Sequence, residues 1–473
     1  MQDSRKKICI ITLALCFITA FIYLFFPMSV SMQDSGALAH IEKGLGLSKA
    51  ESTFENGNYA ELKYKIQEKG NAEEYNGAST LYISPLVSVS KAFHKNFDIR
   101  LLGLFYLILM LAAIWIVLRH VTMKQTWQNI MLAALLYFVF FDVAYLVYFN
   151  TLYTEAGFLV FLVLACALYA KLAFSDKPQK PTLILYYFCA FLLCGMKPNM
   201  AFAGIFFALM GLRLLPLRRG YTFRILNVVL AALIAVVPFF QFRDVMPANR
   251  EQNLYNSVFY GILKDQEDVP AALEKLGLSS ALAPYAGTAS FQVNIDSDDL
   301  KTEFFDKIGY GDVVTYYLTN PSVFLDKWNV SANNAFENRP RYLGNYTVES
   351  GKEAKDLAGG FALYSTVKRT VFPAKTGFVL LFAVLFIVGA VYLRRKTDNG
   401  GGKAFCDASV ILGFFSLLLF PVPVITFGES ELARHMGVYA MLFDVMFVIA
   451  VCGIALIVTQ RRNNLKEKYG VNQ

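Results

Sequence analysis

The chain has 473 residues, of which 56% are hydrophobic, 15% are aromatic and only 17% are charged. Soluble domains carry about 25% charged residues, so this composition excludes an ordinary soluble fold. The net charge of +8 does not indicate nucleic-acid binding, because the basic residues form short clusters beside long apolar runs, where they orient membrane helices.

Ten apolar runs are long enough, or nearly so, to cross a bilayer as helices of about 20 residues. They lie near 8–27, 100–118, 129–147, 156–172, 182–195, 200–217, 224–241, 374–393, 405–427 and 436–458. The short run at 182–195 is the weakest of them. We therefore predict an all-α polytopic membrane protein with about ten transmembrane helices.

Lysine and arginine clusters occur in every second connection between these runs, and also before the first run and after the last. Such clusters mark the cytoplasmic side. Both termini are therefore expected in the cytoplasm, with residues 28–99 and 242–373 on the opposite face. We expect three parts: a membrane module over 1–241 that includes the outer loop 28–99, an extracytoplasmic domain over 242–373, and a three-helix segment with a cytoplasmic tail over 374–473.

The first apolar run has some features of a signal peptide, since it follows basic residues and precedes the small-residue triplet Ser29-Val30-Ser31. Signal peptides usually have an apolar region of about 7–15 residues, and this run is longer. We therefore expect it to remain as a membrane anchor.

Local signals predict helices in the hydrophilic segments. Asp34 can cap a helix from Ser35 to Lys43. Within 242–373, Asp268 can cap a helix that has proline in its first turn and ends at a glycine, and Asn320-Pro321 can start another towards Phe336. This outer segment is therefore predicted to be mainly helical. The three glycines 400–402 are expected to form a flexible turn.

Two polar clusters lie near the outer ends of the N-terminal spans. The first is Gln33-Asp34-Ser35, where Asp34 is either a helix cap or a functional carboxylate. The second is the segment from Tyr148 to Glu155, which also contains Asn150 and Tyr153. Glu155 either begins a helix, where the helix dipole favours an acid, or serves a site.

Two more clusters lie on the same face. Lys197-Pro198-Asn199 places a cation on the outer side, which either reaches the membrane interface or binds a ligand. The segment 428–435 contains Glu429, Arg434 and His435, which either pair with one another or line a site. Charges at membrane depth are costly and usually mark function.

Taken together, these clusters indicate a cavity with carboxylates on one side and cations on the other. A carboxylate can act as general base on a sugar hydroxyl. Arginine and lysine bind and stabilise a phosphate leaving group.

The chain resembles the GT-C superfamily of membrane glycosyltransferases, and in particular the WsfD-like hexosyltransferases of bacterial glycan biosynthesis. The resemblance rests on motifs that occur in order along the chain. They are Gln33-Asp34 with Gly44–Leu47, the segment from Tyr148 to Glu155, Lys197–Asn199, Tyr255–Leu263, Arg339–Tyr346, and Gly428-Glu429 through Arg434-His435.

The resemblance implies an inverting transfer of a hexose from polyprenyl phosphate to a surface glycan, such as an S-layer glycan, a capsule or a wall polymer, on the outer face of the bacterial cytoplasmic membrane. It implies Asp34 as general base, with Glu155 as a second catalytic candidate that holds the acceptor or a cation. The remaining candidates bind substrate: the phosphate contacts come from Lys197, Arg434 and His435, the sugar pocket from Tyr148, Asn150 and Tyr153, and further contacts from Asn199 and Glu429.

One feature departs from the superfamily pattern. Many members carry two adjacent acids in the first outer loop, but Asp34 is followed by Ser35. A single carboxylate is a poor magnesium site. No metal ligands are therefore assigned, and a divalent cation is left open.

Two functions from other classes remain as alternatives. A transporter or flippase for lipid-linked sugars would also need polar residues within the membrane, although transporters usually place them near the midplane between related halves. A non-catalytic partner of a glycan assembly machine would use the outer domain as a docking surface.

Overall fold

The computed structural model describes residues 2–26, 29–49, 59–67, 77–93, 96–175, 179–197, 200–218, 220–243 and 247–469. Within these ranges, six helical segments are long and apolar enough to cross a membrane. They are α1 (Gln2–Phe25), α5 (Arg100–His120), α8 (Thr154–Phe174), α18 (Thr376–Lys396), α19 (Gly400–Leu419) with α20 (Val422–Phe427), and α21 (Leu432–Tyr469).

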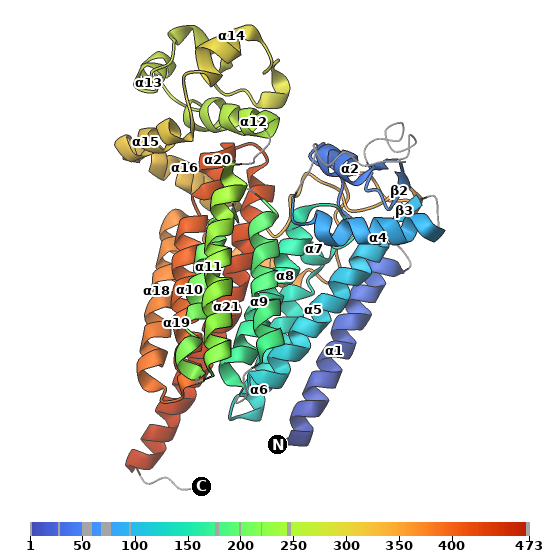
Figure 1. Cartoon of the computed structure of the whole chain (residues 1–473), viewed down its shortest axis with the longest axis vertical. Helices are drawn as coiled ribbons and strands as arrows, with labels where there is room; N and C mark the ends of the chain where they lie inside the picture. The colour runs from blue at the N-terminus through green and yellow to red at the C-terminus, as the bar shows by residue number, and fades with distance from the viewer. Residues whose placement is uncertain are drawn as a thin grey trace.

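Four shorter apolar helices coincide with the other predicted spans. They are α6 (Thr126–Phe140), α9 (Lys180–Gly195), α10 (Ala203–Leu212) with the 3-10 turn η2 (Leu215–Leu217), and α11 (Tyr221–Arg243). The helices stand side by side in one bundle (Figure 1). The predicted all-α polytopic membrane fold is confirmed.

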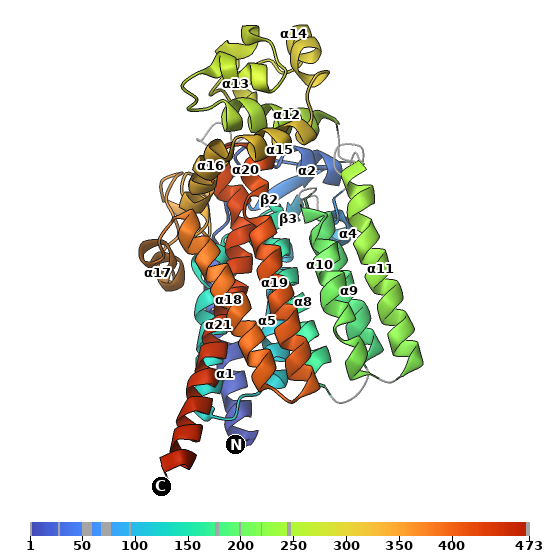
Figure 2. The same ribbon diagram turned by 90° about the vertical axis from the view of Figure 1, so that its left-hand side faces the viewer.

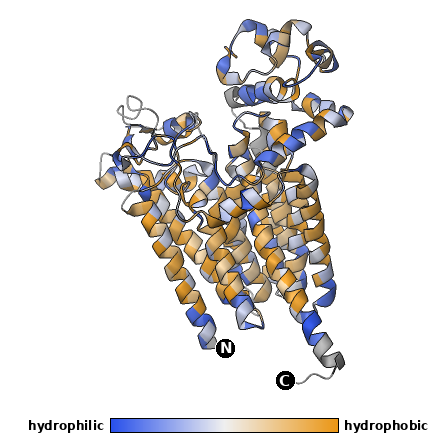
Figure 3. Cartoon of the chain, turned by 180° about the vertical axis from the view of Figure 1, so that it is seen from behind, coloured by the Kyte–Doolittle hydropathy of each residue, from blue (hydrophilic) through white to orange (hydrophobic). Residues whose placement is uncertain are grey.

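The burial of the helices differs across the bundle. The apolar window of α8 is 83% buried, whereas those of α1 and α18 are only 28% buried. Helix α8 packs against α5, α9, α19 and α21 and forms the centre. The outer helices present large apolar side chains outwards, such as Ile10 at 67% and Leu385 at 60% exposure. The helices of the bundle are mostly coloured as hydrophobic in Figure 3. A surface of this kind fits lipid and not water.

Both chain ends lie at one end of the bundle, opposite the helices α12–α16 (Figure 1). In the rotated view, α9, α10 and α11 stand next to one another along one side, away from α18 and α21 (Figure 2). This arrangement agrees with termini on one side and segment 242–373 on the other. The assignment of the terminal side to the cytoplasm stays a prediction.

The described part of the first outer loop contains two helices and a small antiparallel sheet. The helices are α2 (Ala39–Leu45) and α4 (Thr80–Phe93), and the strands β1 (Leu47–Ser48), β2 (Lys63–Ile66) and β3 (Asn96–Asp98) pair in that order. The predicted helix start at Ser35 is wrong. Gly36 has φ of +96°, which no helix accommodates, so a turn intervenes and the helix begins at Ala39.

Beyond α11, the chain forms a small helical unit with its own apolar core, which includes Tyr255, Phe259 and Phe304. We call it the outer unit. Its elements are α12 (Pro247–Ser257), the π-helix η3 (Val258–Ile262), α13 (Val269–Lys275), η4 (Ser280–Tyr285), η5 (Ser290–Gln292), α14 (Asp298–Leu300), the π-helix η6 (Lys301–Phe305) and α15 (Tyr310–Thr319), followed by α16 (Pro321–Asn334).

Both helices predicted in this segment are confirmed. Asp268 caps α13 by accepting a hydrogen bond from the Ala271 N–H at 3.0 Å, and α16 begins at Pro321. The domain boundaries 1–241, 242–373 and 374–473 stay a prediction.

Residues after α16 return to the bundle through η7 (Val348–Ser350) and α17 (Leu363–Val371). The Gln33 N–H donates to the Gly344 carbonyl at 2.9 Å, which ties this segment to the first outer loop. On α17, Lys368 forms an ion pair of 2.6 Å with Asp444 of α21, and both side chains are fully buried. The flexible turn predicted at Gly400 is wrong: helix α19 begins there, capped by the Asn399 side chain.

Candidate functional site

A tight turn brings the second polar cluster to the top of the central helix. Asp142 caps the short helix α7 (Val143–Leu146) by accepting a hydrogen bond from the Ala144 N–H at 2.9 Å. The chain then turns through residues 148–153 into α8, so that Glu155 lies in the first turn of that helix. Its carboxylate is fully buried.

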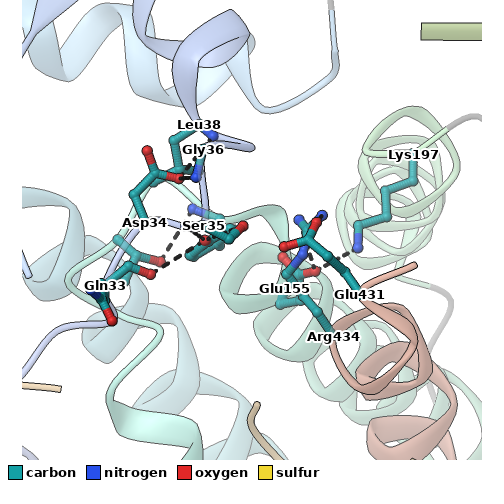
Figure 4. Close-up of polar contacts among 11 residues, drawn as sticks. Gln33, Asp34, Ser35, Gly36, Leu38, Glu155, Lys197, Glu431 and Arg434 are labelled. Carbon is teal, nitrogen blue, oxygen red and sulfur yellow. Dashed lines mark hydrogen bonds and ion pairs between the residues drawn. The ribbon is translucent and has the colours of Figure 1, made fainter. Parts of the chain in front are cut away.

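Glu155 is the centre of a four-residue charge cluster drawn from three helix ends (Figure 4). Lys197, just after α9, lies with Nζ 2.6 Å from Glu155 Oε1. Arg434 of α21 has Nη1 4.0 Å from the same oxygen and Nη2 2.5 Å from Glu431 Oε2. We call these four residues the Glu155 cluster. It contains two cations and two carboxylates, so its net charge is zero.

Several polar atoms at this place have no hydrogen-bonding partner among the described residues, although they are buried. They are Glu155 Oε2, Arg434 Nε, His435 Nδ1 and the Tyr148 hydroxyl. Burying such groups without partners costs about 1–3 kcal/mol each. Their convergence indicates that a polar ligand completes the site.

Two groups of the site that lie outside the membrane spans, Lys197 and Tyr148, have shifted pKa values. Burial lowers the pKa of Lys197, against the opposing effect of the Glu155 carboxylate. Burial, with a further contribution from Glu155, raises the pKa of Tyr148. Tyr148 therefore stays protonated and can donate a hydrogen bond to an anionic ligand.

Tyr153 connects the Glu155 cluster to the first outer loop. Its hydroxyl accepts a hydrogen bond from the Ser35 N–H at 2.9 Å and donates to the Gln33 carbonyl at 3.3 Å. The Arg434 guanidinium lies over its ring, 5.3 Å from the centroid. Tyr153 thus connects the backbone beside Asp34 with Arg434 of the Glu155 cluster.

Asp34 lies in a second charged group on the outer loop. Its Oδ1 accepts hydrogen bonds from the Gly36 and Leu38 N–H groups at 2.9 and 3.1 Å. Its Oδ2 pairs with Lys49, whose Nζ is also 3.4 Å from Glu42 Oε1. Asp34 therefore combines the two roles considered for it. One oxygen caps a turn, as a structural residue would, and the other faces a cation, as a functional carboxylate could.

This arrangement does not fit a divalent cation at Asp34. The Lys49 ammonium lies between the carboxylates of Asp34 and Glu42, where a metal ion would have to bind. Across the part of the chain that the structure describes, no group of three or more histidine, cysteine, aspartate or glutamate side chains could hold a metal.

Three other candidate residues do not belong to the Glu155 cluster. Asn150 donates to the Leu24 and Val30 carbonyls at 3.0 Å each, so it fixes the start of the outer loop. Glu429 pairs with Lys327 at 2.7 Å and with Lys264, at the junction with the outer unit. Asn199 lies outside the described residues.

His435 and two residues not selected as candidates also belong to the site. His435 stacks on Phe427, with ring centroids 3.6 Å apart. Glu431 pairs with Arg434 three residues later, a spacing that could have been recognised in the sequence. Lys49 had no sequence signal, because its contact with Asp34 depends on how the loop folds.

Comparison with known families agrees with this architecture. A family model described as the YfdI N-terminal transmembrane domain matches residues 2–471. Neither a curated protein nor a solved structure matches the chain. The match covers nearly the whole chain, which therefore belongs to the YfdI-like family of membrane proteins.

Proposed function

We propose that this protein is a hexosyltransferase of the WsfD-like type, which transfers a hexose from polyprenyl phosphate to a surface glycan with inversion. The reaction would take place on the outer face of a bacterial cytoplasmic membrane. The observation that carries the proposal is the Glu155 cluster, in which two partly buried cations and unpartnered polar atoms converge at the end of an apolar helix bundle.

The donor phosphate fits the cationic side of this cluster. Arg434 has one buried N–H group without a partner, and Lys197 has spare donors beyond its contact with Glu155. Both cations can hold the phosphate oxygens, and Tyr148 can donate a further hydrogen bond. The prenyl chain would then extend along the apolar outer surface of the helices, which water does not solvate well.

Asp34 is the proposed base for the acceptor. Two backbone N–H groups orient its carboxylate through Oδ1. Oδ2 pairs with Lys49 and keeps a second lone pair, which can take a proton. As the acceptor hydroxyl oxygen bonds to the hexose C1, its proton passes to Asp34 and the bond from C1 to the phosphate oxygen breaks. The departing polyprenyl phosphate gains one negative charge, which Lys197 and Arg434 stabilise.

Lys49 is a positioning residue in this proposal, which acts through Asp34. Its ion pair with Asp34 holds that carboxylate in place before the acceptor arrives. No step requires a metal ion, since a lysine ammonium already lies between the two loop carboxylates.

The test is transfer of labelled sugar by purified protein in detergent, with synthetic polyprenyl-phosphate hexoses as donors and the host glycan as acceptor. The proposal predicts labelled glycan and free polyprenyl phosphate in equal amounts. The same donors are also placed in liposomes that contain the protein. Movement of labelled lipid across the bilayer without any transfer would instead establish a flippase.

A further inference from the structure

A pocket of about 470 Å³ lies where the outer unit meets the top of the bundle. Its wall combines three parts of the chain that are distant in sequence. Tyr260 and Phe291 come from the outer unit, Asn334, Glu337 and Tyr342 from α16 and the loop after it, and Glu431 from the turn before α21. The volume falls within the range of about 300–1,000 Å³ that is usual for small-ligand sites.

The pocket combines exposed aromatic rings with hydrogen-bond acceptors. Phe291 is 80% exposed and Tyr342 is 47% exposed. Flat apolar rings bind the C–H faces of a sugar, while carboxylates and amides accept hydrogen bonds from its hydroxyl groups. These two features together favour a carbohydrate over a purely apolar ligand.

The charges of the wall do not favour a phosphate as the main ligand. Among the described residues that line the pocket, Arg341 is the single cation, against the carboxylates of Glu337, Glu429 and Glu431. Glu429 is neutralised by Lys264 and Lys327, which face it from the outer unit and from α16. The pocket therefore suits an uncharged ligand with many hydroxyl groups.

Glu431 joins this pocket to the Glu155 cluster. It lines the pocket and at the same time pairs with Arg434, whose other nitrogen approaches Glu155. The backbone of this turn is strained at Glu431, which has φ of +45°, whereas Gly428 adopts its φ of +57° without a steric cost. A Cβ atom at Gly428 would lie 2.2 Å from the Asn256 carbonyl oxygen, so close packing on the outer unit holds the turn in place. Strain retained by packing is common at functional sites.

We propose that this pocket binds the terminal sugars of the acceptor glycan, and that these sugars are uncharged. The inference rests on the proposed glycosyl transfer and deepens it by giving the acceptor a separate site from the donor. The outer unit then acts as one wall of the acceptor site, and Glu431 lies at the boundary between acceptor and donor.

The kinetic test uses Phe291→Ala, with Leu318→Ala as the matched control. Both side chains are exposed apolar groups on the outer unit, at 80% and 72% exposure, but only Phe291 lines the pocket. Loss of one stacking contact of about 1 kcal/mol raises the acceptor KM by about fivefold. The donor KM, and the slow hydrolysis of donor without acceptor, stay unchanged. Equal acceptor KM values for parent and Phe291→Ala would overturn the inference.

A second test is independent of catalysis. The purified protein is applied to an array of defined oligosaccharides without donor. Binding by the parent and by Leu318→Ala, with weaker binding by Phe291→Ala and by Glu337→Gln, supports the pocket even if no transfer is found. Absence of glycan binding by the parent, or binding that neither pocket variant weakens, would overturn the pocket while leaving the proposed transfer to its own assay.

Discussion

Replacement of Lys197 by methionine tests the proposed donor site most sharply. The four charges of the Glu155 cluster sum to zero, and methionine keeps the length of the side chain but removes one positive charge. The cluster then carries a net negative charge where the phosphate must bind. The leaving phosphate gains a negative charge during transfer, so the missing ammonium weakens the transition state more than the bound donor.

The expected loss of kcat can be estimated from other enzymes in which one group that stabilises a developing negative charge has been removed. Removal of one group that stabilises a developing oxyanion costs about 2.7–4 kcal/mol, which lowers kcat by about 10²–10³-fold. Arg434 remains 4.0 Å from Glu155 and still compensates its buried charge, so the protein is expected to fold.

The assay measures initial rates of sugar transfer against donor concentration. Lys307→Met is the control, since Lys307 also pairs with a carboxylate, Glu303, but lies on the outer unit outside both the Glu155 cluster and the pocket. Lys197→Arg keeps the charge and should retain more activity than Lys197→Met. A Lys197→Met protein with normal thermal unfolding and a kcat within threefold of the parent would refute the role of this lysine.

Three further predictions concern pH, metal dependence and stability. Because burial lowers the pKa of Lys197, its positive charge is lost at a lower pH than for an ordinary lysine. A pH profile of the transfer rate should therefore show the donor KM rising on the alkaline side. Lys197→Arg should move this rise to higher pH. Since Lys49 lies where a metal would bind, transfer should persist in excess EDTA, and strict dependence on added Mg²⁺ or Mn²⁺ would show that this interpretation is wrong. Lys368→Met leaves Asp444 as a buried charge without its ion-pair partner, and should lower the free energy of unfolding by about 3–5 kcal/mol. Adding Asp444→Asn should restore part of this loss. No change in the thermal unfolding of Lys368→Met in detergent would argue against the ion pair.

Much of the membrane fold could be predicted because the signal is local. Each span is a continuous apolar run, and in lipid every backbone N–H and C=O group must be satisfied within the helix. The described structure accordingly has ten apolar helical segments where ten runs were predicted. The cap at Asp268 and the helix start at Pro321 were also predictable, because they depend on neighbouring residues alone.

Two local predictions were wrong at glycines. Gly36 turns the chain before α2 can begin, and the glycines at 400–402 join α19, whose first turn is capped by the Asn399 side chain. Low helix propensity of glycine is overcome there by packing: a Cβ atom at Gly401 would lie 2.2 Å from the Ala173 carbonyl oxygen. Sequence patterns alone carry no information on such contacts.

The site was predicted in part for the same reason. Polar residues at outer span ends indicated a common face, and Glu155, Lys197 and Arg434 do lie together. The pairing of Asp34 with Lys49, and that of Glu429 with Lys327, depend on loop and outer-unit folds that no local pattern specifies. The catalytic and binding roles of all these residues stay predictions.

The most direct measurement compares Asp34→Asn with the parent in transfer of labelled hexose from polyprenyl phosphate. Asp98→Asn is the control, because Asp98 is also an ion-paired carboxylate of the first outer loop. Loss of a general base should lower the rate of the Asp34 variant by about 10²–10⁴-fold, while Asp98→Asn stays near the parent. Transfer by Asp34→Asn at the parent rate would contradict the assignment of Asp34 as base, and absence of transfer by the parent from any polyprenyl-phosphate hexose would contradict the proposed function itself.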